Sequence, residues 1–217
     1  MKAARFSSFG APAEVIQVVD EDPGPLAPGE ALLEVLATPI NPSDGAAIGG
    51  FYGILPKLPA VPGNEGVGRV VRVEGAAPVK PGDIVFLPMG GGTWRTHLKA
   101  KAQRLLPVPP GADLLQMAML SINPPTAELL LREFVPLQRG EWLIQNAANS
   151  AVGRYLITLA KREGIKTINV VRRSGLADGT LHAPVDATFP LENIKEALTR
   201  ALEGGRQGKV LLTPVKA

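Results

Sequence analysis

The stretch Trp142-Leu-Ile-Gln-Asn-Ala-Ala-Asn-Ser-Ala-Val-Gly153 decides the fold class of this chain of 217 residues. Its first four residues, Trp142–Gln145, form a short apolar run that is typical of a buried strand. The small residues of Asn146–Gly153 are suited to a tight turn. The helix that we expect next carries one apolar stripe, formed by Val152, Tyr155, Leu156, Leu159 and Ala160.

A second strand is predicted at Thr167–Val171, after Gly164 ends the helix as its C′ residue. The order strand, turn, helix, strand is the βαβ unit that opens a dinucleotide-binding domain. Only residues 174–217 follow Arg173, which is too short a segment to complete a doubly wound sheet. The sequence therefore predicts a truncated dinucleotide-binding unit.

The turn is a candidate phosphate site. In the G-x-G-x-x-G turn, glycines let the backbone approach a pyrophosphate at a helix N-terminus. The corresponding positions here are Ala148, Ser150 and Gly153, so only the last glycine is present. The alternative is a structural turn that binds no ligand. The candidate cofactor-binding residues of the turn are Asn146, Ala148, Asn149, Ser150, Ala151, Val152 and Gly153.

Arg172 and Arg173 follow the second predicted strand. A unit that prefers NAD places an acidic residue about 20 positions after the turn, where it accepts the ribose 2′-hydroxyl. Guanidinium groups instead suit a 2′-phosphate, through charge-assisted hydrogen bonds. The pair therefore favours NADPH, with a solvated basic strand end as the alternative.

Composition limits the remaining classes. Apolar residues make up 45% of the chain and charged residues 20%, as in ordinary globular proteins. The net charge of +3 is spread along the chain without a long basic run, so nucleic-acid binding is not expected. Cysteine is absent, which excludes disulfides and thiolate metal sites. No apolar run has membrane-spanning length and no signal-peptide core is present, so we predict a cytoplasmic protein.

The rest of the chain is predicted as a β-rich domain with helices after residue 115. Strands are expected at Ala31–Ala37, Val67–Val73, Ile84–Pro88, Val185–Phe189 and Lys209–Thr213. Helical patterns cover Gln116–Phe134 and Leu191–Glu203. The second of these helices has an apolar stripe of Ile194, Ala197, Leu198, Ala201 and Leu202.

Several runs, in order, resemble the medium-chain dehydrogenase/reductase superfamily, and within it the zinc-independent 2-enoyl thioester reductases and quinone oxidoreductases. They are Asn41-Pro-Ser-Asp44, Leu58-Pro-Ala-Val-Pro-Gly-Asn-Glu-Gly66, Lys80-Pro-Gly-Asp83, Gly92-Thr-Trp-Arg95, Ile122-Asn-Pro-Pro-Thr-Ala127, Gln145-Asn146 and Ser150-Ala-Val-Gly153. Zinc-dependent relatives place histidine where this chain has Asn64. The two histidines, His97 and His182, lack ligand-like neighbours, so no metal site is expected.

The resemblance implies a mixed α/β fold, with a GroES-like β-rich catalytic domain and a truncated Rossmann βαβ unit. The implied boundaries are 1–120 for the first part of the catalytic domain, 121–174 for the dinucleotide-binding unit, and 175–217 for the return to the catalytic domain. The sheet edge left open by the truncation is expected to pair with the C-terminal segment, or with a second copy in a homodimer.

The resemblance also implies candidate catalytic residues. Tyr52 takes the position of the proton donor, with an aromatic that packs a loop as the alternative. Asn41 either orients the nicotinamide ribose or donates to the substrate carbonyl, and it equally suits a turn or helix cap. Trp94 either walls the substrate pocket or belongs to the core.

The implied activity is NADPH-dependent reduction of the C=C bond of 2-enoyl thioesters, as acyl-CoA or acyl-carrier-protein esters. The first alternative is an NADPH:quinone oxidoreductase. The second is a non-catalytic GroES-like remnant or an engineered domain-deleted scaffold, in which NADPH binding is weak or lost.

Overall fold

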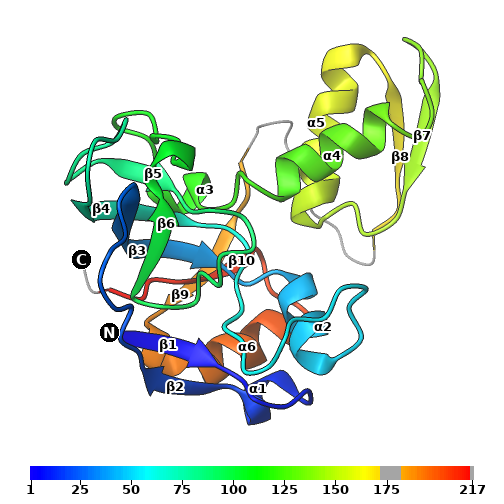
Figure 1. The fold of residues 1–217 in the computed structure, drawn as a ribbon. Coiled ribbons are helices and arrows are strands. Elements are labelled where there is room, and N and C mark those ends of the chain that lie inside the picture. The colour runs from blue at the N-terminus through cyan, green and yellow to red at the C-terminus, as the bar shows by residue number, and fades with distance from the viewer. Residues whose placement is uncertain (172–181, 216–217) are drawn as a thin grey trace. The chain divides into compact units, whose positions relative to one another are not determined.

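A computed structural model describes residues 1–171 and 182–215, and divides the chain into two compact units. The first unit contains Met1–Met119 and Val185–Ala217, and the second contains Leu120–Pro184. Helices and strands occur in both, so the predicted mixed α/β class is confirmed (Figure 1).

The first unit is built on a six-stranded sheet. Its strand order is β5-β4-β3-β10-β9, and β6 pairs with β3. From Glu30 to Ala37 successive residues of β3 alternate between partly buried and buried, as the two-residue period of a strand requires, and the last three residues of the strand are all buried. The strands are β3 (Glu30–Pro39), β4 (Val67–Val73), β5 (Ile84–Phe86), β6 (His97–Lys101), β9 (Val185–Phe189) and β10 (Lys209–Leu212).

The C-terminal strands complete this sheet. β10 runs antiparallel to β3, with Leu211 opposite Pro39, and parallel to β9. The prediction that the C-terminal segment pairs with the open edge of the βαβ unit is therefore wrong. The backbone groups of β9 and β10 are used inside the first unit, where Val210, Leu211 and Leu212 are buried.

Shorter elements surround the sheet. They are β1 (Lys2–Arg5), β2 (Gln17–Asp20), α1 (Pro12–Val15), α2 (Pro42–Gly49), the 3-10 turns η1 (Ala102–Arg104) and η2 (Leu191–Asn193), α3 (Leu114–Met117) and α6 (Ile194–Leu202). Four residues of the predicted α6 stripe are buried, but Leu202 is exposed. Leu202 is the last residue of the helix, where the stripe has turned away from the core.

The second unit contains the predicted strand, turn, helix and strand. β7 (Trp142–Gln145) pairs in parallel with β8 (Lys166–Asn169), and α5 (Ala151–Glu163) connects them. Gly164 ends α5 with a φ of 75°, as predicted. The helical region predicted from Gln116 is two helices, because Pro124 and Pro125 begin a separate helix, α4 (Asn123–Arg132).

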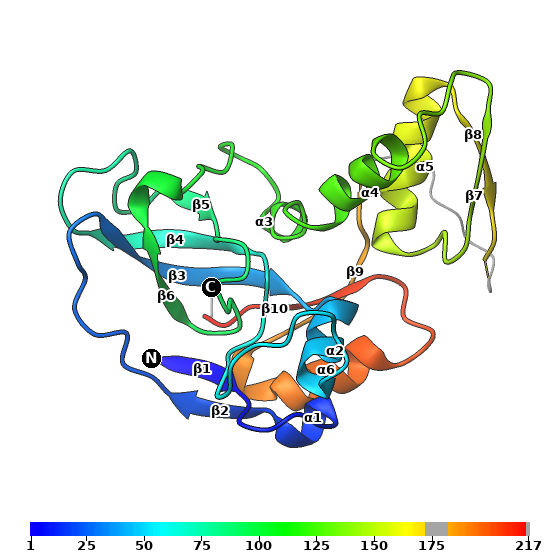
Figure 2. The ribbon, with the colours of Figure 1, turned by 45° about the vertical axis from the view of Figure 1, so that its right-hand side comes forward.

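The sheet of the second unit is covered on one face. Leu131 of α4, Ala160 of α5 and Ile165 form a small core with partly buried Leu143 of β7. Trp142 and Ile144 of β7 and Ile168 of β8 are exposed, so the prediction that Trp142–Gln145 is a buried strand is wrong. α4 and α5 lie together on the same side of β7 and β8 (Figure 2). Parallel sheets are normally covered on both faces, whereas among the residues of this unit that the structure describes the helices cover one face only.

None of the helices in the described ranges combines the length and apolar character needed to cross a membrane.

Candidate functional site

The N-terminus of α5 has the geometry of an anion-binding site. Ser150 caps the helix, because its Oγ accepts a hydrogen bond from the Gly153 N–H at 3.1 Å. Within residues 1–171 no acceptor is recorded for the N–H groups of Ala151 and Val152. Free N–H groups and the positive end of the helix dipole together favour a phosphate at this position.

Gly153 is required by the close approach of the helix to the turn. A Cβ at this position would lie 2.7 Å from the Ala148 carbonyl oxygen. Ala147 has a φ of 46°, the left-handed region that non-glycine residues rarely adopt. Ala148 is fully buried, and its N–H donates to the Val170 carbonyl at 3.4 Å, so its contribution is to packing. The turn therefore keeps the compact backbone of a phosphate cradle with one glycine.

The carboxyl ends of β7 and β8 meet at this turn. Gln145 Nε2 donates to Asn169 Oδ1 at 2.7 Å and to the Gly153 carbonyl at 3.3 Å, which ties both strands to the helix. Asn146 is exposed at the end of β7, and the Asn149 carbonyl accepts a hydrogen bond from Arg154. Arg172 and Arg173 lie outside the described residues, so their role stays a prediction. The residues present fit the diphosphate of a dinucleotide.

Asn41, in the first unit, joins three buried charged groups. It follows β3 and precedes α2, and its backbone N–H donates to Asp44 Oδ2 at 2.8 Å, one half of a capping box. Its Nδ2 donates to Glu65 Oε1 at 2.9 Å. Its Oδ1 accepts a hydrogen bond from the ammonium of Lys209 on β10. Asn41 can therefore cap α2 through its backbone and at the same time use its side-chain amide in polar contacts.

Burial shifts the pKa of two members of this cluster. Desolvation raises the pKa of Asp44 to about 6, against the hydrogen bonds from Asn41 and Asn64 that favour its charged form. Desolvation also lowers the pKa of Lys209 to about 8, while Glu65 and Asp44 act in the opposite direction. Asn64, which stands at the position of a zinc ligand in zinc-dependent relatives, donates to Asp44 Oδ1 at 2.8 Å.

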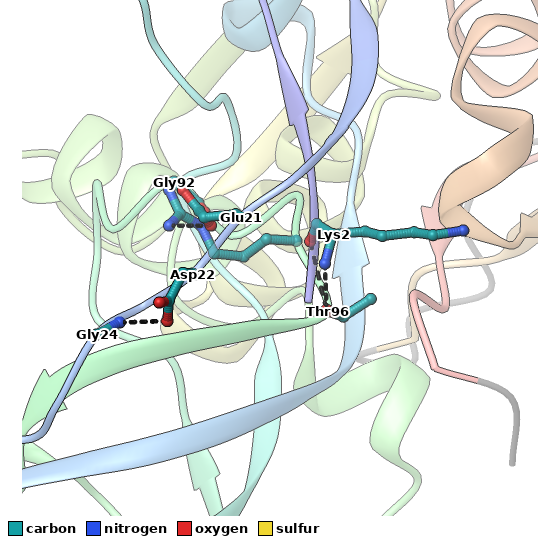
Figure 3. A network of polar contacts seen from close by, with 7 residues as sticks. Lys2, Glu21, Asp22, Gly24, Gly92 and Thr96 are labelled. Carbon is teal, nitrogen blue, oxygen red and sulfur yellow. Dashed lines mark hydrogen bonds and ion pairs between the residues drawn. The ribbon is translucent and has the colours of Figure 1, made fainter.

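The run Gly92-Thr-Trp-Arg95 makes packing and polar contacts within the first unit. Trp94 is 0% exposed, and its Nε1 donates to the Pro39 carbonyl at 3.4 Å. Arg95 pairs with Glu21 at 2.8 Å and also donates to the Gly92 carbonyl. Figure 3 shows Glu21 and Gly92 close together in this polar network. Trp94 is a core residue here and presents no surface to a ligand, so the structure gives its predicted pocket role no support.

Tyr52 lies on an exposed apolar segment. Its side chain is 48% exposed, and Phe51, Ile54 and Leu55 around it are also exposed. α2 separates it along the chain from Asn41, and no hydrogen bond joins Tyr52 and Asn41 where the structure describes them. The role of Tyr52 as proton donor stays a prediction.

Sequence motifs did not indicate Lys209 or Glu65 as partners of Asn41. Lys209 and Asn41 are 168 positions apart, so only the pairing of β10 with β3 brings them together. One signal was available: Lys209 begins a strand whose other residues are all apolar, and a lysine in a buried strand needs a partner.

Comparisons with known proteins indicate the family to which the chain is related. The family model of the alcohol dehydrogenase GroES-like domain matches residues 27–110. The mitochondrial enoyl-acyl-carrier-protein reductase of Rattus norvegicus is 44% identical over 174 residues, which are 79% of this chain and 47% of the relative. The Homo sapiens enzyme of the same name is 42% identical over the same length. The chain thus spans about half the length of the curated relatives that it matches.

Solved structures give the same result. The mitochondrial 2-enoyl thioester reductase heterodimer of Candida tropicalis is 32% identical with a TM-score of 0.71, over 80% of this chain and 54% of that chain. A complex of Etr1p with NADP and crotonyl-CoA matches equally well. A protein of Bacillus thuringiensis named as an NADPH:quinone reductase has a TM-score of 0.87 at 23% identity, over 99% of both chains, and supports the fold alone.

A GroES-like unit combined with a dinucleotide-type βαβ unit defines an oxidoreductase fold. The chain belongs to the medium-chain dehydrogenase/reductase superfamily, as its sequence resemblance indicated.

Proposed function

We propose that this chain carries the catalytic domain and the phosphate-binding turn of an NADPH-dependent reductase of 2-enoyl thioesters. One observation carries the proposal. The capped N-terminus of α5, with the N–H groups of Ala151 and Val152 available, lies at the carboxyl ends of a parallel strand pair. The identity to enoyl-acyl-carrier-protein reductases supports the substrate class.

The proposal gives each candidate residue a role. NADPH, when bound, supplies a hydride to the β-carbon of the enoyl thioester. The turn from Asn146 to Gly153 binds the diphosphate, and Arg172 and Arg173 bind the 2′-phosphate. Tyr52 donates the proton of its hydroxyl to the α-carbon. The Asn41 amide donates to the thioester oxygen or orients the ribose.

A quinone is the alternative acceptor. The Bacillus thuringiensis protein named as an NADPH:quinone reductase shares the fold, but it is less similar in sequence than the enoyl reductases. A chain that oxidises NADPH with a quinone but not with a crotonyl thioester would select the alternative. If the chain oxidises NADPH with neither acceptor, the non-catalytic remnant is the supported alternative.

A homodimer through the second unit is part of the proposal. β7 and β8 have no other strand partner in the described part of the chain, and their uncovered face exposes Trp142 and Ile144. A second copy that covers this face would supply the layer that a parallel sheet needs. Light scattering after size exclusion tests this: a dimer that Trp142→Lys dissociates supports it, and a monomer at every concentration contradicts it.

Localisation in the cytoplasm stays a prediction, and the curated relatives carry the word mitochondrial in their names.

The test of function is NADPH oxidation with a crotonyl thioester, followed at the NADPH absorbance. The proposal expects turnover in the intact chain, and a loss of roughly 100-fold or more in kcat for Tyr52→Phe, because the proton donor is removed. Phe51→Leu is the matched control, since it changes an exposed neighbouring ring without a hydroxyl. Full activity of Tyr52→Phe would contradict the assigned proton donor.

A further inference from the structure

The buried side chains of Lys209, Asn41 and Glu65 form a connected group whose order follows from their hydrogen-bonding capacities. Lys209 is a donor only, and an ionised carboxylate such as Glu65 is an acceptor only. Asn41 lies between them, with its Oδ1 toward Lys209 and its Nδ2 toward Glu65 at 2.9 Å. Reversing the amide would place donor against donor and acceptor against acceptor.

We propose that Lys209 and Glu65 are positioning residues, which hold the Asn41 amide in one orientation so that its nitrogen acts as a hydrogen-bond donor to the bound thioester or cofactor. This inference rests on the role proposed for Asn41 above. The amide nitrogen carries two hydrogens, and Glu65 accepts one of them. The second is the donor that the proposed reaction uses.

The position of Lys209 is set by the C-terminal strand. β10 pairs with β3 through Leu211–Pro39 and Leu212–Thr38, close to the point where β3 ends and Asn41 begins the next segment. The other residues of β10 are apolar and buried, so an apolar side chain at position 209 would suit the strand. Burying an ammonium instead carries a desolvation cost, which well-packed apolar residues would avoid.

A second layer of contacts keeps the group in place. The hydroxyls of Thr38 and Thr93 both donate to the Glu65 carbonyl, at 2.7 Å and 3.0 Å. Asp44 accepts the Asn41 N–H and therefore fixes the backbone of the same residue. Side chain and backbone of Asn41 are thus both held by charged groups.

The first test uses nuclear magnetic resonance of the intact chain and needs no cofactor. The ammonium of Lys209 is faced by the charged groups Glu65, Asp44 and Arg206, and burial lowers its pKa to about 8. Lys209 loses its proton between about pH 7 and pH 9.5, and the hydrogen bond that it donates to Asn41 Oδ1 then changes. The side-chain amide signals of Asn41 should move with the Lys209 Cε signal.

Variants make this test specific. Lys209→Met should abolish the pH-dependent movement of the Asn41 amide signals, and Lys195→Met, on the exposed face of α6, should retain it. Asn41 signals that stay fixed in the unmodified chain while Lys209 titrates would overturn the proposal. That result is available even if Lys209→Met does not fold.

Kinetics separate positioning from a purely structural role. Where the chain turns over, Lys209→Met should lower kcat by about ten-fold or more, while KM for NADPH changes little, because a misplaced donor weakens the reacting geometry. Lys209→Arg, which keeps the donor and the charge, should recover part of the rate. Equal activity of Lys209→Met and the unmodified chain would contradict the inference. A chain without turnover would instead overturn the proposed function, and the magnetic resonance titration would still decide the positioning.

Discussion

The two tryptophans show how differently the two units of this chain are built. Trp94 of the first unit is 0% exposed, whereas Trp142 of the second unit is 61% exposed. Trp94 packs in a core with Phe6, Ile40 and Ile48, while Trp142 is an exposed side chain at the start of β7. The first unit therefore carries its own stabilising core. The second, where the structure describes it, holds the candidate phosphate turn on a sheet with helices on one face.

The largest expected difference comes from the same substitution in each unit. Trp94→Ala should destabilise the first unit by about 3–5 kcal/mol, because it removes a fully buried aromatic side chain. Trp142→Ala should cost under about 1 kcal/mol, since most of the ring is already in water. Hydrogen exchange at the amides of Leu33 and Leu156 reads the two units separately. If Trp94→Ala and Trp142→Ala lost the same free energy of unfolding, the contrast between the two units would be wrong.

The next effect concerns pH and the first unit only. The pKa of Asp44 is raised from 3.8 to about 6, so its contribution to stability is full below about pH 4 and is lost as pH rises through 6. The loss attributable to this group is on the order of 3 kcal/mol. Asp44→Asn should flatten the fall of the unfolding free energy between pH 4 and 7. Asp20→Asn, at an exposed site, is the control, and an unchanged slope in Asp44→Asn would contradict the account.

How much the sequence predicts depends on whether an interaction is local. The presence of α5 between the two strands and its end at Gly164 follow from periodicity and small residues within a short segment. The strand at Val67–Val73 and the strand at Val185–Phe189 are found as predicted. Local patterns of this kind determine where an element lies, but they carry little information on what it pairs with.

Long-range partners account for the errors. The open edge of the βαβ unit was expected to pair with the C-terminal segment or with a second copy. The C-terminal strands β9 and β10 instead complete the sheet of the first unit beside β3. The buried contact between Lys209 and Asn41 has no sequence motif, because it depends on that pairing. Gly153 is the opposite case, since a close backbone approach leaves a glycine that the sequence shows directly.

Gly153 provides a smaller effect that is confined to the second unit. Gly153→Ala should destabilise that unit by about 2 kcal/mol, because the new Cβ would lie 2.7 Å from the Ala148 carbonyl oxygen. Exchange should quicken at the amides of α5 and stay constant in β3. Gly53→Ala is the matched control, since no atom lies within 4 Å of a Cβ at that position. If Gly153→Ala and Gly53→Ala show the same amide exchange, the inferred tight contact between the turn and α5 is contradicted.

The smallest expected effect is the loss of the helix cap. Ser150→Ala should cost about 1 kcal/mol, because the Gly153 N–H loses the side-chain acceptor that now lies at 3.1 Å. Ser8→Ala, at an exposed site away from any helix start, should be neutral. Urea denaturation followed by circular dichroism of the helices checks the difference. A neutral Ser150→Ala would show that the cap contributes nothing to α5.

Calorimetric titration with NADPH, and with NADH as the control, tests the central claim most directly. The account predicts that NADPH binds and that NADH binds more weakly, because Arg172 and Arg173 pair with the 2′-phosphate that NADH lacks. Replacing both arginines by alanine should lower the affinity for NADPH by ten-fold or more and leave NADH unchanged. An absence of binding at about 1 mM NADPH, or equal affinities for the two cofactors, would contradict the account.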